Sequence, residues 1–146
     1  MSESEQRPRV LYTAEATVKG GRRGHGVTSD GVMEVDFTSP KELGGDGARG
    51  TNPEQLFALG YGACWENAML GIARRKGLDV EDATVTARVG VGPIASGRLG
   101  LAVELLITLP SLPDGEQAKA LIDEAEQRCP YSNAVRGNVE VKLTLL

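Results

Sequence analysis

The clearest helix start in the chain lies in residues 52–77, NPEQLFALGYGACWENAMLGIARRKG. Asn52 is a favourable N-cap, Pro53 suits the first helical position, and Gly77 suits a helix end. Placed at about 100° per residue, the apolar side chains cover most of the circumference, which is typical of a helix buried on most sides. We therefore predict a long central helix that begins after Asn52 and ends at Lys76.

Period-two alternation around this helix predicts five strands, at residues 8–19, 31–37, 83–91, 99–109 and 138–145. The glycine-rich run at 20–26 is expected to be a turn between the first two strands, and residues 38–52 form a long glycine-rich loop. A second helix is predicted from residues 113–114 to Arg128. Strands separated by helices, with short connections, indicate an α+β fold with antiparallel sheets.

The second predicted helix carries a reactive residue type at its end. Its apolar stripe consists of Ala118, Leu121, Ile122 and Ala125. Cys129 follows four residues after Ala125 and continues the stripe, and Pro130 ends the helix. Cys129 is therefore expected to face the core.

Composition restricts the class of protein. The chain has 146 residues, 40% hydrophobic and 25% charged, which fits a single domain over 1–146 with a flexible polar tail at 1–8. A net charge of −4 without a basic stripe argues against nucleic-acid binding. No apolar run approaches the roughly 18–20 residues that span a membrane, and the first residues lack the apolar stretch of a secretory signal. We expect a cytoplasmic protein that binds neither nucleic acid nor membrane.

The two cysteines, Cys64 and Cys129, are the candidate reactive groups. With a single histidine far away in sequence, they lack the paired spacings of a zinc site, so no metal is expected. They are either small buried side chains or a redox pair. Gly60 and Gly62 each cost about 1 kcal/mol in a helix relative to alanine, which suggests close approach by a substrate or a second chain.

A reactive thiol needs a cation or dipole to stabilise its thiolate. Arg22 and Arg23 are both candidates, and spacing alone does not separate them from each other or from solvated surface charges. Glu54 could hold such an arginine through a bidentate pair. Glu54 and Cys64 are ten residues apart, about 15 Å along a straight helix. If both residues serve one site, an intervening arginine, a helix break at residues 60–62 or a second subunit must connect them.

Three segments make the sequence recognisable: LYTAEATVKGGR at 11–22, TNPEQLFALGYGAC at 51–64 and CPYSNAVRGNVEV at 129–141. Together they resemble the organic hydroperoxide resistance branch of the OsmC superfamily, over almost the whole chain. The resemblance implies antiparallel sheets packed around long central helices in an intertwined homodimer, with active sites at the subunit interface.

The resemblance also implies a function, a cysteine-based peroxidase that reduces organic hydroperoxides to alcohols in defence against oxidative stress. Cys64 matches the peroxidatic cysteine, which forms a sulfenic acid, and Cys129 matches the resolving cysteine, which forms a disulfide with it. Arg22 matches the catalytic arginine and Glu54 its acidic partner. No bound cofactor is implied; dihydrolipoamide or a lipoylated protein supplies the electrons. The apolar substrate pocket is expected to involve Phe57, Tyr61 and Trp65.

Three other interpretations stay open. An OsmC-type peroxidase would use the same cysteines on a broader range of peroxides. A non-enzymatic redox-sensing or ligand-binding dimer would oxidise Cys64 without rapid turnover. A structural domain would bury both thiols as inert side chains.

Overall fold

The computed structural model describes residues 7–146, and the contacts divide the chain into two compact units, Met1–Asn52 and Pro53–Leu146. Most of the tail predicted at 1–8 lies outside the described residues. None of the helices in the described part combines the length and the hydropathy that crossing a bilayer requires.

The N-terminal unit contains a three-stranded antiparallel sheet in the order β1-β2-β3. Its elements are β1 (Ala16–Lys19), the 3₁₀ turn η1 (Gly21–Arg23), β2 (His25–Thr28), β3 (Glu34–Asp36) and a second 3₁₀ turn, η2 (Lys41–Leu43). The strand predicted at 8–19 is therefore only four residues long. The predicted turn at 20–26 is shorter too, because its last two residues already pair with β1 and β3.

The turn between β1 and β2 is tight, and its glycines explain why. Gly20 has a φ of +90°, and a Cβ on Gly24 would lie 1.8 Å from the carbonyl oxygen of Lys19. Only glycine fits both positions without moving the backbone. This turn presents Arg22 and Arg23 side by side on η1.

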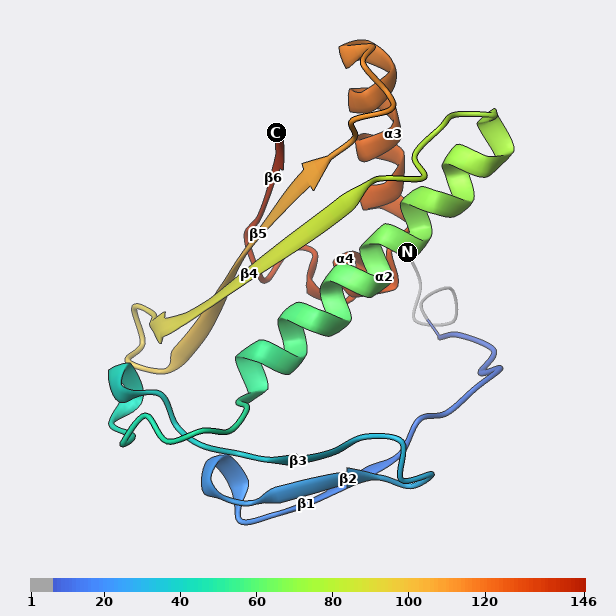
Figure 1. Cartoon of the computed structure of the whole chain (residues 1–146). Helices are drawn as coiled ribbons and strands as arrows, with labels where there is room; N and C mark the ends of the chain where they lie inside the picture. The colour runs from blue at the N-terminus through green and yellow to red at the C-terminus, as the bar shows by residue number, and fades with distance from the viewer. Residues whose placement is uncertain (1–6) are drawn as a thin grey trace. The chain divides into compact units, whose positions relative to one another are not determined.

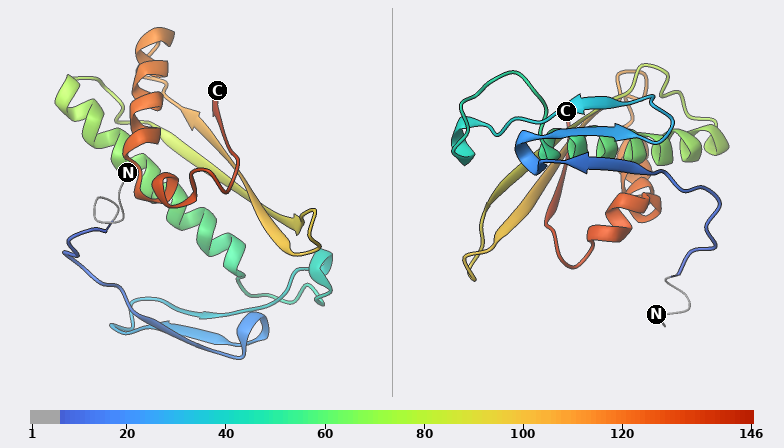
Figure 2. Two further views of the ribbon diagram at one scale, coloured as in Figure 1. Left: turned by 180° about the vertical axis from the view of Figure 1, so that it is seen from behind. Right: turned by 90° about the horizontal axis from the view of Figure 1, so that it is seen from below.

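The C-terminal unit packs helices against one face of a second three-stranded sheet, as Figures 1 and 2 show. Its elements are α2 (Pro53–Lys76), β4 (Thr84–Pro93), β5 (Leu99–Thr108), α3 (Gly115–Arg128), α4 (Pro130–Val135) and β6 (Val141–Leu145). The helix α2 runs along the sheet and contacts β4, while α3 and α4 lie beside it. The predicted α+β class is confirmed, and the central helix has the predicted limits.

One expectation about the sheets was wrong. β4 and β5 are antiparallel, but β5 and β6 are parallel. The chain between them passes through α3 and α4, a crossover that returns it to the end of the sheet where β5 begins, so β6 must run in the same direction. β6 also begins at Val141 instead of 138, because the amides of Asn138 and Val139 bond the carbonyl of Val135 in a turn.

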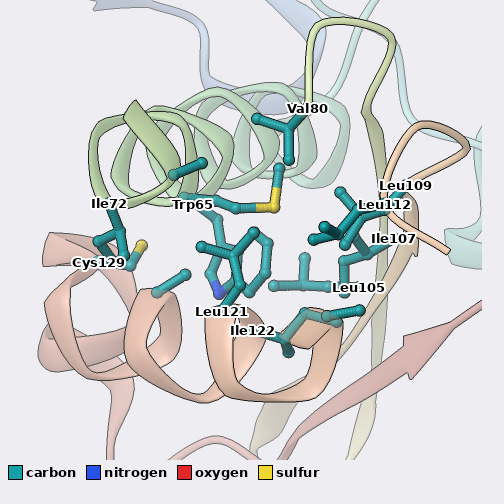
Figure 3. Packing of buried hydrophobic residues seen from close by; sticks show 14 of the residues in the cluster. Trp65, Ile72, Val80, Leu105, Ile107, Leu109, Leu112, Leu121, Ile122 and Cys129 are labelled. Carbon is teal, nitrogen blue, oxygen red and sulfur yellow. The ribbon is translucent and has the colours of Figure 1, made fainter. Parts of the chain in front are cut away.

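The core of this unit lies between α2, α3 and the inner face of the sheet. Trp65, Leu105 and Leu121 are fully buried there, and Figure 3 shows them packed together. The predicted stripe on α3 is confirmed, since Ala118, Leu121, Ile122 and Ala125 are all buried. Cys129 continues it with no exposed surface.

Candidate functional site

The two cysteines meet in the C-terminal unit. The Sγ atoms of Cys64 and Cys129 are 3.8 Å apart, with the Cys129 thiol donating to Cys64. Both are free thiols; Cys64 is half-buried and Cys129 is fully buried. A disulfide needs about 2.05 Å between the sulfur atoms, so a displacement of about 1.8 Å would join them. The pair is therefore close to bonding distance although 65 positions separate it in the sequence.

The backbone places Cys129 at the junction of two helices. Its amide bonds the carbonyl of Ala125 at 2.9 Å, and its own carbonyl accepts from the amide of Asn133 at 2.9 Å. Its φ and ψ of −67° and 124° are extended, as expected before Pro130. Pro130 then begins α4, where a missing amide proton costs nothing.

The surroundings of Cys64 within α2 to α4 disfavour its charged form. Burial raises the pKa of the Cys64 thiol, and Cys129 raises it further, whereas the backbone N–H of Tyr131 lowers it by hydrogen bonding to the sulfur. The net shift is upward. A thiolate at neutral pH would therefore need a cation beyond these groups.

Tyr131 covers the helix next to Cys64. Its ring centroid lies 5.9 Å from that of Phe57 and 5.6 Å from that of Tyr61. A Cβ on Gly60 would lie 2.7 Å from the Tyr131 hydroxyl oxygen and 3.2 Å from two ring carbons. The close approach expected at this glycine is thus made by Tyr131 of the same chain.

The three predicted pocket residues occupy different environments. Phe57 is half-buried beside Tyr131, whereas Tyr61 and Trp65 are fully buried. The indole Nε1 of Trp65 donates to Oε2 of Glu126 at 3.0 Å, and the Tyr61 hydroxyl lies 2.6 Å from Oγ of Ser132. Tyr61 and Trp65 therefore expose no surface to a substrate, and none of the three residues lines the cavity that contains Cys64.

Sequence reasoning missed three residues of this site, Glu126, Tyr131 and Ser132. Ser132 is 1% exposed and donates to Oε2 of Glu126 at 3.0 Å. Ser132 could have been predicted from its position, because it follows Cys129 by three residues and lies on the inward face of a short helix.

The predicted ionic residues fall in both units. Arg22 is half-buried in the middle of η1, whereas the neighbouring Arg23 is exposed. Glu54 is half-buried in the first turn of α2, ten residues before Cys64 on the same helix. This helix is continuous, so the break considered at 60–62 is wrong. If Glu54 and Cys64 serve one site, an arginine or a second subunit has to connect them.

Among residues 7–146, no three His, Cys, Asp or Glu side chains gather in a way that could hold a metal ion. The chemistry that this cluster offers is that of two thiols, one half-buried and one buried, at near-bonding distance.

Comparison with known proteins places this arrangement in a family. A sequence model of the OsmC-like protein family matches residues 44–144. The organic hydroperoxide resistance protein of Xanthomonas axonopodis pv. citri (strain 306) is 48% identical over 138 residues, 94% of this chain and 96% of the relative. OhrB, the organic hydroperoxide resistance protein of Bacillus subtilis (strain 168), is 40% identical over 93% of this chain and 98% of its own.

Solved structures of organic hydroperoxide resistance proteins have the same fold as this chain. The crystal structure of an organic hydroperoxide resistance protein from Elizabethkingia anophelis has a TM-score of 0.88 to this chain at 46% identity, covering 94% of this chain and 98% of that one. The chain belongs to the OsmC-like protein family. Within it, the similar proteins described above carry the name organic hydroperoxide resistance protein, which supports a role in peroxide detoxification.

Proposed function

We propose that this chain is a cysteine-based peroxidase that reduces organic hydroperoxides to alcohols through Cys64 and Cys129. The observation that carries the proposal is the 3.8 Å between their Sγ atoms, with Cys64 half-buried and Cys129 buried. The names of the relatives supply the substrate class. A pair of inert core thiols would not require one member to reach toward the surface.

In the first step the Cys64 thiolate attacks one oxygen of the O–O bond. The bond breaks, the sulfur gives up two electrons and becomes a sulfenic acid, and the departing alkoxide takes a proton to become the alcohol. Burial favours the neutral thiol, so this step needs help from a cation. Arg22 serves this role, stabilising the thiolate and the developing alkoxide, and Glu54 holds its guanidinium.

In the second step Cys129 attacks the sulfenic sulfur of Cys64. The disulfide forms, and the sulfenic oxygen leaves as water with the proton of the Cys129 thiol. A dithiol then restores both thiols by exchange, becoming a disulfide itself. Cys129 is fully buried, so the reductant attacks at Cys64. Dihydrolipoamide or a lipoylated protein has the required dithiol chemistry.

The assembly proposed for this chemistry is a homodimer in the cytoplasm, where dithiols stay reduced. Among the described residues of the N-terminal unit, only Gly26 and Phe37 are buried. A small sheet with so little core needs further apolar surface to be stable, and a second copy would provide it. The two units would then work as one domain. Phe57 and Tyr131 would form an apolar wall beside Cys64, supported by Tyr61 and Trp65, and would favour bulky peroxides.

The test compares peroxides with dihydrolipoamide as reductant. Reduction of cumene hydroperoxide should be much faster than reduction of hydrogen peroxide, and Cys64→Ser should abolish both because the attacking sulfur is gone. Equal rates with the two peroxides would indicate the broader OsmC-type activity. Oxidation of Cys64 without turnover would indicate a redox sensor, and an active Cys64→Ser variant would refute the mechanism.

A further inference from the structure

A partly buried hydrogen-bond network connects the helices that carry the two cysteines. Oε2 of Glu126 accepts from Trp65 Nε1 at 3.0 Å and from Ser132 Oγ at 3.0 Å. Ser132 Oγ lies 2.6 Å from the Tyr61 hydroxyl. Figure 3 shows the indole nitrogen of Trp65 directed toward α3. Three helices, α2, α3 and α4, therefore meet at one carboxylate oxygen.

The direction of each hydrogen bond follows from the donor inventory. A serine hydroxyl has one proton, and the Ser132 proton goes to Glu126. The Tyr61 hydroxyl must then donate to Ser132. Burial raises the pKa of Tyr61, which keeps that proton in place. The network thus runs from Tyr61 through Ser132 to Glu126 and ends on an acceptor that also holds Trp65.

The residues of the network lie on both sides of each cysteine in the sequence. Tyr61 and Trp65 lie three residues before and one residue after Cys64, on α2. Glu126 and Ser132 lie three residues before and three after Cys129. A second contact reinforces the α3–α4 junction, since the Arg136 guanidinium donates to the backbone carbonyl of Glu126 at 2.9 Å.

We propose that Glu126 is a positioning residue for the resolving step, a role that rests on the proposed peroxidase function. Its carboxylate holds the turn bearing Cys129 against the helix bearing Cys64, and so determines how fast Cys129 attacks the sulfenic acid. The same contact holds α4, whose Tyr131 amide bonds the Cys64 sulfur. The hydrogen bonds of the Glu126 carboxylate described above come from Trp65 and Ser132 and not from a cysteine, so Glu126 acts on the two sulfur atoms through these residues.

The expected size of the effect follows from the geometry. The sulfur atoms are 3.8 Å apart and must approach by about 1.8 Å to bond. A further misplacement of about 1 Å costs on the order of 100-fold in rate. A sulfenic acid that waits longer for Cys129 meets a second peroxide more often and becomes sulfinic acid. Loss of Glu126 should therefore lower the peroxide concentration that half-overoxidises Cys64 by about 100-fold.

The experiment measures overoxidation of Cys64 by mass spectrometry during turnover, over a series of cumene hydroperoxide concentrations. Disulfide formation is followed by stopped-flow fluorescence of Trp65, the chain's single tryptophan. Glu126→Ala should slow disulfide formation far more than the first peroxide step, because the first step does not involve Cys129 and only the weaker effect through the Tyr131 amide reaches it. In Glu126→Gln the rate of disulfide formation should stay within about tenfold of that of the unmodified chain. Trp65 and Ser132 both donate to the same carboxylate oxygen, and the carbonyl oxygen of a glutamine amide can accept both hydrogen bonds.

Glu124→Ala is the matched control on the same helix. Its carboxylate pairs with Lys76 at 2.8 Å and Arg128 at 3.7 Å at the surface, so resolution should not change. Should Glu126→Ala not fold, Ser132→Ala removes one branch of the network with little change in volume and should also slow resolution. Normal resolution in folded Glu126→Ala or Ser132→Ala, or a Glu126→Gln variant as slow as Glu126→Ala, would overturn the positioning role.

Disulfide formation in the unmodified chain distinguishes a failure of the proposed peroxidase mechanism from a failure of the proposed role of Glu126. If peroxide produces no Cys64–Cys129 disulfide there, both proposals fail. If the disulfide forms in the unmodified chain and forms equally fast in Glu126→Ala, only the role of Glu126 fails.

Discussion

Replacing Gly60 by alanine tests how Tyr131 is seated beside Cys64. Alanine is the better helix former, and at an unobstructed position the exchange stabilises a helix by about 1 kcal/mol. At Gly60 the added Cβ would lie 2.7 Å from the Tyr131 hydroxyl oxygen and 3.2 Å from two carbons of its ring. The ring is packed against Phe57 and Tyr61, so it has to leave its position. Such overpacking costs about 1–3 kcal/mol.

The net expectation for Gly60→Ala is a free energy of unfolding lower by about 0–2 kcal/mol. Gly62→Ala is the matched control two residues along α2. Its new Cβ would be 3.8 Å from the Val85 carbonyl oxygen and 3.9 Å from the Ala87 Cβ, which are ordinary contacts. Gly62→Ala should gain about 1 kcal/mol, or roughly 3 °C in Tm for a chain of this size.

The assay is thermal unfolding of both variants, combined with the rate of the first peroxide step. Displacing Tyr131 should also move its amide away from the Cys64 sulfur and raise the thiol pKa further, so Gly60→Ala should react more slowly at neutral pH. Gly62→Ala should react normally. If Gly60→Ala is as stable as Gly62→Ala and fully active, the packing of Tyr131 on Gly60 contributes neither to the stability of the chain nor to the reactivity of Cys64.

Three further predictions concern the thiols and the single histidine. Cys129→Ser should still oxidise once with peroxide but should then overoxidise Cys64 to the sulfinic acid; a mass spectrum without added oxygens would contradict this. Arg22→Ala should slow the peroxide step and move the midpoint of its rate–pH profile upward, because without this cation burial keeps the pKa of the Cys64 thiol high. Arg23→Ala should change neither quantity, because Arg23 is exposed. The reverse result would show that Arg23 is the catalytic arginine. The hydrogen bonds to two carboxylates raise the pKa of His25, so its pairing should stabilise the sheet fully below pH 6.5 and less as the pH rises through its folded pKa. An NMR titration of its ring protons with a midpoint at or below 6.5 would show that the pairing is absent.

Much of the architecture could be predicted because it depends on local patterns. The limits of α2 follow from Pro53 and Gly77, which are start and stop signals that act within one turn of helix. The buried position of Cys129 follows from the period of the α3 stripe. The strand β2 was not predicted, and the reason is also local. Glycines at 20, 21, 24 and 26 indicate a turn, and a strand of only four residues is too short to show a clear alternation of side chains.

Local sequence patterns were enough to place Cys64 inside a long helix and Cys129 on an inward-facing stripe, because periodicity and end signals act over a few residues. The prediction that this helix is buried on most sides was wrong for the chain as described, since its buried residues share one face and Leu59 is 72% exposed. Three features depend on the packing of the folded chain: the 3.8 Å between the two sulfur atoms, the position of Tyr131 over Gly60, and the hydrogen bonds by which Glu126 joins Trp65 to Ser132. The parallel pairing of β6 belongs with these. Each of them joins residues distant in the chain, and such contacts depend on how the helices and strands pack, which no local pattern encodes.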